Sequence, residues 1–495
     1  MKTLFSFDDH SLPFRSNLDL TLLQGVKYSG NPIIKRGAPG TPDARWARLW
    51  GGTVLHDQGK FRMWYSGADS IEDWMCCRFR MLYAESDDGI HWTKPDLGLA
   101  SYRGSKNNNV CQVDYPVEMP AILLEEGPEI PDDERYKMFT ENHQATSILP
   151  FIATSTDGLI WRTIEHPRQR GVSLYRFNGL YHSAYVLYSS ELPGGFNPGR
   201  AMGVIRSKDF RQWTSEPNLA FHRANYYEYP PDTTEQVHTP AGFWNRGNMI
   251  VGVYGQIHQV DARPGGKFAR QGSGMEDTRE DLGLFLSNDG LHFREPITSF
   301  KFVARGMEGQ WDGGSMMPAH AFVNVGEHTY LYYGAWDNGM CFDNAAGDIG
   351  MAFWRRDGFG HVRIRDISQP AILQTDTLAP DSRDREVFVN FDIDCYRSGC
   401  GLNFELVDLA GQPVPGYTVD DCITCTEPGL CQPVRWKTHD SIGKEIREPV
   451  EMRIYFQTNG DITPYAGICS SPLFYCLYIA DKGGIGKELP VVNLA

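Results

Sequence analysis

The chain has 495 residues, 41% of them hydrophobic and 12% aromatic, so it is long enough to bury one large core or several. Its formal net charge of −15 disfavours nucleic acid and anionic membrane surfaces as partners, because both would repel it. No apolar run reaches the roughly 18 residues of a membrane-spanning helix, and the first ten residues lack the apolar core of a secretion signal, which favours a soluble, cytoplasmic protein unless a signal was removed.

The first 40 residues have a different composition from those that follow. They mix polar and apolar positions and contain Pro13, Pro32 and Pro39, which interrupt regular structure. We expect residues 1–40 to form an arm that lies over the following domain or over a neighbouring subunit. This arm, or the C-terminal domain, is where we would expect a homo-oligomer to form.

Residues 41–365 contain five copies of one pattern. The clearest copy, Met81–Trp92, has an alternating, strand-like first half, then an Asp-Gly turn and a tryptophan. The aspartate can accept a hydrogen bond from the backbone two residues on, the glycine can adopt positive φ, and the tryptophan is spaced to fold back over the turn. The turn aspartates are Asp88, Asp157, Asp209, Asp289 and Asp357.

Most copies follow two further strand-like runs, as a four-stranded blade requires. The third copy is the weakest, with Leu180–Tyr188 and the hairpin signal Asn178-Gly179. We therefore predict a five-bladed β-propeller over residues 41–365. The other runs are Gly52–His56, Phe61–Ser66, Met119–Leu124, Tyr136–Thr140, Thr239–Trp244, Met249–Gln256, Met317–Val323 and Thr329–Gly334.

Residues 366–495 show short strand patterns and no helical period. We predict a second all-β domain, a β-sandwich with a structural role, built on Val387–Phe391, Leu402–Val407, Val434–Trp436, Val450–Phe456 and Phe474–Ile479. Cys422 and Cys425, with Cys431 nearby, have a zinc-like spacing but no second pair, so buried reduced thiols explain them more simply. We expect no metal site and no cofactor.

The innermost strands of a propeller converge on one axis, so residues just ahead of those strands share a pocket. A single carboxylate at such a position more often caps a turn or faces solvent, but several meeting at one axis indicate a site. The carboxylates are Asp114, Glu118, Glu235, Glu308 and Asp312. Around them we expect substrate-binding side chains from Arg45, Arg48, Trp50, Glu141, His143, His238, Trp311 and His320, together with Asp114.

Carboxylates around a pocket lined by tryptophans suit glycosidic bond cleavage, in which one acid protonates the departing oxygen and a carboxylate opposite attacks the anomeric carbon or activates water. We assign Glu235 as the acid, because His238 and an apolar stretch beside it favour a raised pKa. Asp312 is the candidate base or nucleophile, because its neighbouring glycines leave room for backbone donors. Glu118, or Asp114 in its place, would orient substrate hydroxyls.

Several phrases of the chain resemble the five-bladed propeller glycoside hydrolases, the superfamily that holds families 32, 43, 68, 117 and 130. They are GGTVLHDQGKFRMWY from Gly51, YAESDDGIHWTKPDLGL from Tyr83, the run Gly104–Asn109, DDERYKM from Asp132, LSNDGLHFREP from Leu286 and GQWDGG from Gly309. Within the superfamily the chain is most similar to bacterial family-32-like proteins with a C-terminal β-sandwich. The resemblance implies a glycoside hydrolase whose substrate is an oligosaccharide or other glycoside.

The chain departs from that family in its signature motifs. WMNDPNG, RDP and ECPD are absent, and the first blade, which supplies the family's nucleophile, offers only Asp43 nearby. The leading hypothesis is hydrolysis of a furanoside or other oligosaccharide, with an acidic or anhydro sugar suggested by Arg45 and Arg48. A transglycosylase or fructotransferase on the same fold, or a carbohydrate-binding propeller without catalysis, stays open.

Overall fold

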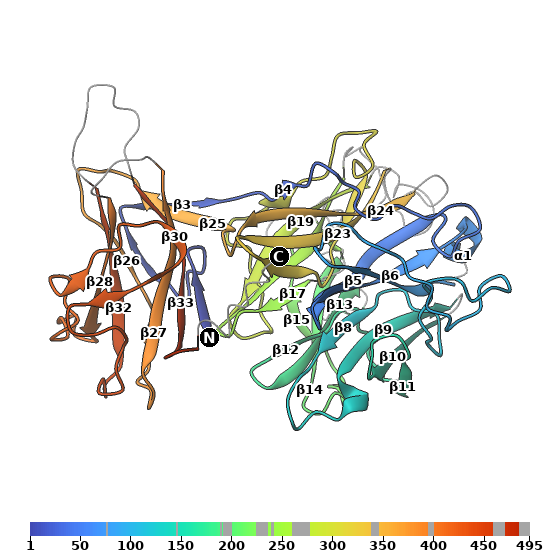
Figure 1. Cartoon of the computed structure of the whole chain (residues 1–495), viewed down its shortest axis with the longest axis horizontal. Coiled ribbons are helices and arrows are strands. Elements are labelled where there is room, and N and C mark those ends of the chain that lie inside the picture. The colour runs from blue at the N-terminus through green and yellow to red at the C-terminus, as the bar shows by residue number, and fades with distance from the viewer. Residues whose placement is uncertain are drawn as a thin grey trace.

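A computed structural model describes residues 1–75, 78–144, 147–188, 191, 200–223, 236–238, 242–259, 278–337, 346–394, 400–458 and 471–484. It is almost entirely β, as the sequence predicts, with one short helix, α1 (Ile71–Met75), and one 3-10 turn, Asp132–Glu134. Within these ranges no helix has both the length and the apolar character to cross a membrane. Two lobes lie side by side, one formed by the middle of the chain and one by its C-terminal part (Figure 1).

The larger lobe consists of five successive groups of mainly antiparallel strands. Group 1 contains β5 (Trp46–Asp57), β6 (Lys60–Ala68) and β7 (Arg80–Ser86); group 2 contains β8 (Ala121–Leu124), β9 (Tyr136–Gln144), β10 (Ser147–Ser155) and β11 (Arg162–Glu165). Group 3 contains β12 (Tyr175–Phe177), β13 (Leu180–Tyr188), β14 (Arg200–Ser207) and β15 (Asn218–Phe221). Group 4 contains β16 (Gln236–His238), β17 (Phe243–Asn245), β18 (Ile250–Gln259), β19 (Thr278–Ser287) and β20 (Lys301–Val303). Group 5 contains β21 (Ser315–Met317), β22 (Phe322–Val325), β23 (His328–Trp336), β24 (Gly347–Arg355) and, from the N-terminal segment, β4 (Val26–Lys27).

The run Met317–Val323, predicted as one strand, is divided between β21 and β22. Between them the chain leaves its own group and pairs with β5, where the His320 amide donates to the Gly52 carbonyl at 2.8 Å and the Val54 amide donates to the His320 carbonyl at 2.9 Å. Pro318 lacks an amide hydrogen, so continuing a regular ladder there would lose a hydrogen bond. The result is a direct tie between groups 5 and 1.

The turns form as predicted in the first four copies, with Phe210 in place of glycine in the third copy at a φ of +66°. Asp88 Oδ1 accepts the amide hydrogens of the residues two and three positions on at 2.8 Å each, and Asp157, Asp209 and Asp289 repeat this arrangement. Trp92 folds back and donates from Nε1 to the Gly89 carbonyl at 3.0 Å. In the fifth copy Asp357 itself has positive φ, and its carboxylate points to buried partners instead.

Each turn is held by the group that precedes it, and the series closes on itself. Trp64 of group 1 donates to Gly158 of group 2 at 2.6 Å, and Phe139 of group 2 packs edge-on against Trp213 of group 3. The remaining ties run from Tyr175 of group 3 to Gly290 of group 4 at 2.7 Å, from Arg246 of group 4 to Asp357 of group 5 at 3.0 Å, and from Tyr332 of group 5 to Gly89 of group 1 at 2.8 Å. The contacts therefore form a closed cycle, from group 1 through group 5 and back to group 1.

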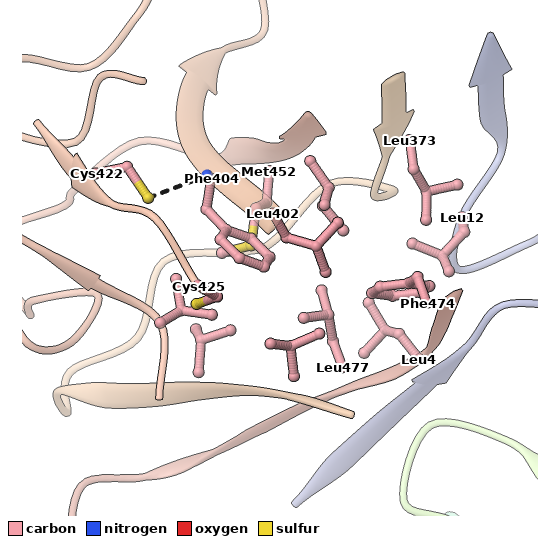
Figure 2. Close-up of a cluster of buried hydrophobic side chains, with 14 of the residues drawn as sticks. Leu4, Leu12, Leu373, Leu402, Phe404, Cys422, Cys425, Met452, Phe474 and Leu477 are labelled. Atoms are coloured by element: carbon pink, nitrogen blue, oxygen red, sulfur yellow. Dashed lines mark hydrogen bonds between the residues drawn. The ribbon is translucent and has the colours of Figure 1, made fainter. Parts of the chain in front are cut away.

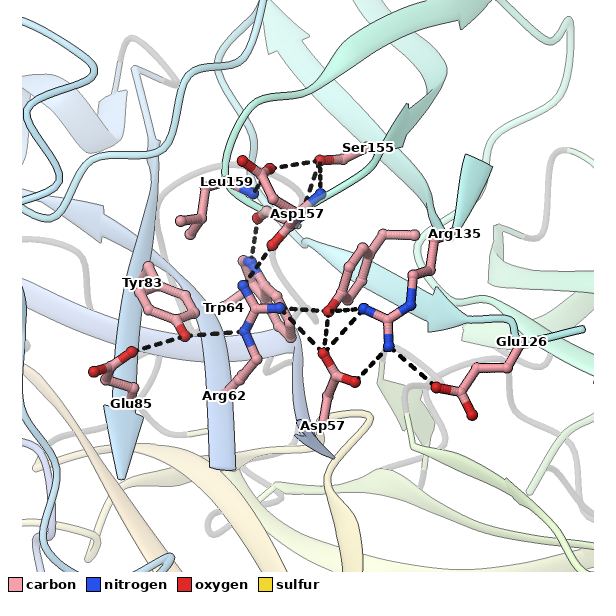
Figure 3. A network of polar contacts seen from close by, with 12 residues as sticks. Asp57, Arg62, Trp64, Tyr83, Glu85, Glu126, Arg135, Ser155, Asp157 and Leu159 are labelled. Carbon is pink, nitrogen blue, oxygen red and sulfur yellow. Dashed lines mark hydrogen bonds and ion pairs between the residues drawn. The ribbon is translucent and has the colours of Figure 1, made fainter. Parts of the chain in front are cut away.

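Groups 1 and 2 share a dense polar network beside one of these turns (Figure 3). Asp57, at the end of β5, accepts hydrogen bonds from Arg135 at 2.6 Å and from Arg62 at 3.3 Å. Arg62 also donates to the Asp157 carbonyl of the second turn. Hydrogen bonds from Arg135 and Tyr136 outweigh burial and hold the pKa of Asp57 below its usual value. The network joins two groups through side chains where no strand ladder connects them.

All five groups also line one cavity of about 440 Å³. Its walls come from Thr53 and Leu55 of β5, from β8 and β12, from β17, and from residues 320–322 of group 5. Convergence of consecutive groups on a common cavity, with a closed cycle of contacts, is the arrangement that the propeller prediction implies.

The smaller lobe has two sheets that enclose one apolar core. One sheet orders β3 (Leu18–Leu22), β25 (Gly360–Ile364), β33 (Pro472–Asp481), β27 (Arg385–Ile393) and β30 (Gly429–Pro433), with β1 (Lys2–Phe5) also paired to β33. The other orders β2 (Phe14–Ser16), β26 (Ala371–Gln374), β32 (Val450–Gln457) and β28 (Gly401–Asp408). A small ribbon joins β29 (Cys422–Ile423) to β31 (Arg435–Trp436). Because β25 precedes residue 366, this lobe begins upstream of the predicted boundary.

The N-terminal segment contacts both lobes. The sequence predicts an arm over the propeller or a neighbouring subunit, and Val26–Lys27 pairs with β24 of group 5. Leu4 and Leu12, however, lie in the C-terminal core beside Leu477 and Phe474 (Figure 2). The alternating apolar residues of β1 and β3 supply one side of that core, which explains the strand pairing. A homo-oligomer through either segment stays a prediction.

The paired cysteines are buried thiols in the same core. Cys422 Sγ accepts the Phe404 amide hydrogen at 3.2 Å (Figure 2). Burial raises the pKa of Cys422, and it raises the pKa of Cys425 to about 12. Thiols held in the protonated form are poor metal ligands.

Candidate active site

A continuous set of contacts joins residues of groups 1, 2 and 4. Both terminal nitrogens of Arg48 donate to Glu118 Oε1 at 3.1 and 3.0 Å, and the guanidinium lies 3.8 Å from the centre of the Trp50 ring. The Trp50 ring lies 4.9 Å from that of His238, whose Nδ1 is 2.8 Å from Glu280 Oε2. We call these five residues the axial cluster.

A bulge in β5 positions Arg48 and Trp50 of the axial cluster. The pairing of β5 with β6 shifts register between Arg48 and Thr53, and Gly51 within this stretch has a φ of +59°. A side chain at Gly51 would lie 2.7 Å from Met119, so only glycine allows the close approach of groups 1 and 2. Bulges of this kind re-aim side chains, and here Arg48 and Trp50 both face the cluster.

His238 and Glu280 form a buried pair, 3% and 0% exposed. Burial raises the pKa of Glu280 well above its usual value, with the charge of Asp281 adding to the effect and Arg200 opposing it. Burial also lowers the pKa of His238 well below its usual value, helped by Arg200 and Arg48. Both shifts favour the neutral form of each group, and the 2.8 Å contact between His238 Nδ1 and Glu280 Oε2 is a hydrogen bond between them.

Glu118 is buried like Glu280 but has a charged partner. Arg48 offers it a two-nitrogen contact that suits an ionised carboxylate. The axial cluster thus contains one carboxyl group in an ion pair with an arginine and one whose pKa is raised by burial. Two carboxyl groups in such different environments are typical of acid and base pairs in catalysis.

The sequence analysis missed Glu280, although the chain contains a signal for it. Gly255 lies inside β18, and a Cβ there would sit 1.7 Å from Glu280 Oε1. An isolated glycine within a strand indicates that another group approaches closely. In the sequence, Glu280 follows Thr278 and Arg279 and precedes Asp281. A charged residue among such polar neighbours is typical of the exposed end of a strand.

Of the predicted site residues, the structure brings Glu118, Arg48, Trp50 and His238 into contact and places the others elsewhere. Glu141 is buried in an ion pair with Arg170 at 3.1 Å, although its carbonyl contacts the Glu118 amide. Glu235 falls outside the described residues, as does the side chain of His143. Asp114 is exposed and accepts the Thr163 amide hydrogen, and Glu308 is also exposed. Arg45 covers the Trp46 ring. His320 lines the cavity shared by the five groups.

Asp312 and Trp311 pack against group 5 and the N-terminal segment. Lys27 of β4 donates to Asp312 Oδ2 at 2.6 Å, Tyr333 donates to the same oxygen at 3.4 Å, and Trp311 stacks on the Tyr333 ring. Asp43, the carboxylate nearest the first blade, is likewise committed, to Lys94 at 2.5 Å and Tyr65 at 3.0 Å. These contacts favour structural roles for both aspartates.

We expect Asp312→Asn to destabilise the fold more than it impairs the reaction. The substitution removes a buried ion pair with Lys27, which should lower the free energy of unfolding by about 1–3 kcal/mol. Urea unfolding and turnover of the folded variant measure the two effects separately. A fall in turnover of about 10²-fold or more at unchanged stability would restore Asp312 to the reaction.

Among the described residues, no group of three or more His, Cys, Asp or Glu side chains is arranged to hold a metal ion. No protein-family model matches the chain. Two uncharacterized proteins of Mycobacterium tuberculosis, from strains CDC 1551 and H37Rv, are each 30% identical over 118 residues, 22% of this chain and 32% of their own length. The chain thus spans about a third of the curated relatives it matches.

Three solved structures show limited similarity to the chain. A glycosyl hydrolase from Bacteroides ovatus is 16% identical with a TM-score of 0.43, over 68% of this chain and 94% of that one. A structure from family 130, described as mannoside phosphorylases that include hydrolases of β-1,2-mannosidic linkages, is 17% identical with a TM-score of 0.42 over the same shares. A thermostable family-43 glycoside hydrolase is 14% identical, TM-score 0.41, over 66% and 91%. Similarity at this level does not assign an activity to the chain.

Proposed function

We propose that the protein is a glycoside hydrolase that cleaves a glycosidic bond at the axial cluster, and that its five strand groups are the blades of a propeller joined to a β-sandwich. The observation that carries the proposal is that two buried carboxyl groups, Glu118 and Glu280, are linked through Arg48, Trp50 and His238, one in an ion pair and one without an ion pair to arginine or lysine among the described residues. Glycosidic cleavage needs one carboxyl group that can give a proton and one that is ionised. Indole rings are the usual partners of the apolar face of a sugar.

Each member of the cluster then has a role. Glu280 holds the proton destined for the departing oxygen, and His238 fixes the orientation of its carboxyl group. Glu118 supplies the carboxylate opposite, and Arg48 holds it in place through two hydrogen bonds. The indole nitrogen of Trp50 is buried without a hydrogen bond to any described residue, so it can donate to a sugar hydroxyl.

The contacts of Arg48 also bear on the substrate. The sequence suggested an acidic sugar because arginines lie near the site. Since Arg48 is committed to Glu118 and Arg45 covers Trp46, neither offers an uncommitted charge for a sugar carboxylate. A neutral furanoside or other neutral oligosaccharide therefore fits the cluster better.

A screen of aryl glycosides and of plant and algal oligosaccharides, with product analysis, tests this function. We expect the wild-type protein to release a free sugar and Glu118→Gln to lower the rate about 10²-fold, because the substrate is no longer held in line. Glu448→Gln, an exposed change in the smaller lobe, serves as the control and should retain the wild-type rate. Transfer of the sugar to another sugar would indicate a transglycosylase, and binding without turnover a carbohydrate-binding propeller.

A further inference from the structure

The cavity shared by the five groups lies apart from the axial cluster and has no role in the reaction proposed above. Its floor on β5 is formed by Thr53 and Leu55, beyond the bulge that turns Arg48 and Trp50 toward the cluster. At about 440 Å³ it is large enough for a small organic ligand. The sequence placed His320 among the substrate-binding residues, and the structure places it here.

The hydrogen-bonding state of His320 is fixed by its surroundings. The Leu174 amide donates to His320 Nε2 at 3.4 Å, so Nε2 carries no hydrogen. Burial lowers the pKa of His320 to about 3, which keeps the ring neutral at physiological pH. A neutral ring with an acceptor at Nε2 must carry its hydrogen on Nδ1. That N–H makes no hydrogen bond to the described part of the chain and is available to the cavity.

The strands around the cavity supply further polar groups. β8 and β12 each end a sheet, β17 pairs only with β18, and β22 pairs only with β23. Each of these strands therefore has one edge without a ladder, and all four contribute lining residues. Two backbone groups on these edges already have side-chain partners, because the Ile122 amide donates to Thr53 Oγ1 and the Arg176 carbonyl accepts from Asn245. The other backbone groups on these edges need partners in water or in a ligand. Between them lie apolar side chains such as Leu123, Phe243 and Phe322.

The charges at the rim compensate one another. Glu125 pairs with Lys137 at 2.8 Å and with Arg176, and Glu126 contacts Arg135 at 3.1 Å. A charged ligand would have to break these pairs, whereas a neutral ligand would not. The cavity thus combines apolar walls, hydrogen-bonding edges, one fixed N–H donor and no uncompensated charge.

We infer that this cavity is a second ligand site, which takes a neutral saccharide of one or two rings. A sugar ring presents apolar C–H faces and a rim of hydroxyl groups, which match the apolar walls and the strand edges, and a ring or hydroxyl oxygen would accept the N–H of His320. The site is separate from the axial cluster and does not depend on catalysis there.

Saturation-transfer NMR with glucose, mannose, galactose, fructose and sucrose tests the inference on the full chain. It is done in the Glu280→Gln background, where the proposed reaction is blocked, so that turnover and binding are measured apart. We expect signals from at least one of these sugars, and we expect them to fall at least fivefold on addition of His320→Phe, which removes the donor, or of Leu55→Trp, which fills the half-buried wall of the cavity. Leu409→Trp, the same change at an exposed position of the smaller lobe, is the matched control.

Melting temperatures confirm that each variant is folded before binding is compared. Each sugar is tested at 20 mM, which is on the order of the dissociation constants expected for such weak ligands. The absence of saturation transfer from all five sugars would overturn the inference. So would undiminished transfer in both folded cavity variants, which would place the sugar elsewhere. Neither result bears on hydrolysis at the axial cluster, which is tested by turnover in the wild-type protein.

Discussion

Glu280→Gln is expected to lower kcat about 10³-fold on the glycoside that the wild-type protein cleaves fastest, with little change in melting temperature. Glutamine has the shape of the protonated carboxyl group and can keep the hydrogen bond with His238 Nδ1. It cannot release a proton to a departing oxygen. A merely structural Glu280 would tolerate this substitution without loss of rate.

The pH dependence of the same variant separates the two roles further. Burial raises the pKa of Glu280, so its carboxyl group keeps the proton at pH values above the usual pKa of glutamate. The rate should therefore fall as pH rises through the raised pKa. By linkage, the stabilisation from this neutral carboxyl is complete below its unfolded pKa of about 4.3 and is lost as pH rises through the folded pKa. Glu280→Gln should abolish both effects. An unchanged alkaline limb in its residual activity would remove Glu280 from the reaction.

Arg246→Ala is expected to cause the largest loss of stability, about 3–5 kcal/mol, because it leaves a buried carboxylate without its cation. Asp357 is 0% exposed and accepts hydrogen bonds from Arg246 at 3.0 Å and from Tyr478 at 2.8 Å. The pair joins group 4 to the fifth turn, and Tyr478 extends it to β33 of the smaller lobe. The midpoint of urea unfolding measures the loss.

Two comparisons make this prediction specific. The double variant Arg246→Met with Asp357→Asn should lose less stability than Arg246→Ala alone, because no uncompensated charge remains buried. Arg363→Ala, which breaks the exposed pair with Asp394 at 3.7 Å, should cost less than about 1 kcal/mol. If Arg246→Ala cost no more than Arg363→Ala, the cycle of contacts would not depend on this ion pair.

The fold was more accessible to sequence analysis than the site, for a physical reason. The Asp-Gly turns depend on local chemistry, so Asp88, Asp157 and Asp289 could be located and their hydrogen bonds anticipated from the residues alone. The strand runs follow from alternation. The origin of β4 could not be predicted, since two residues of the N-terminal segment complete group 5 and only the closed structure shows where they pair.

The site was predicted in part. The expectation that residues ahead of the inner strands converge holds for Glu118 and His238, which the axial cluster links through Arg48 and Trp50. Asp312 instead pairs with Lys27, whose position beside group 5 cannot be read from its own surroundings in the sequence. Glu280 could not be ranked above its charged neighbours without knowing that its side chain lies over Gly255.

The pairing of β1 with β33 has a consequence for how the chain is made. Lys2 lies opposite Ile479, so β1 can pair only after the long stretch of chain between the two strands has been synthesised. The segment must remain unpaired, with Leu4 and Phe5 exposed, until β33 has been made. Contacts this distant in sequence slow folding and lengthen the period in which aggregation competes. Yield in the cell should therefore depend on chaperone capacity during synthesis more than on the stability of the finished protein.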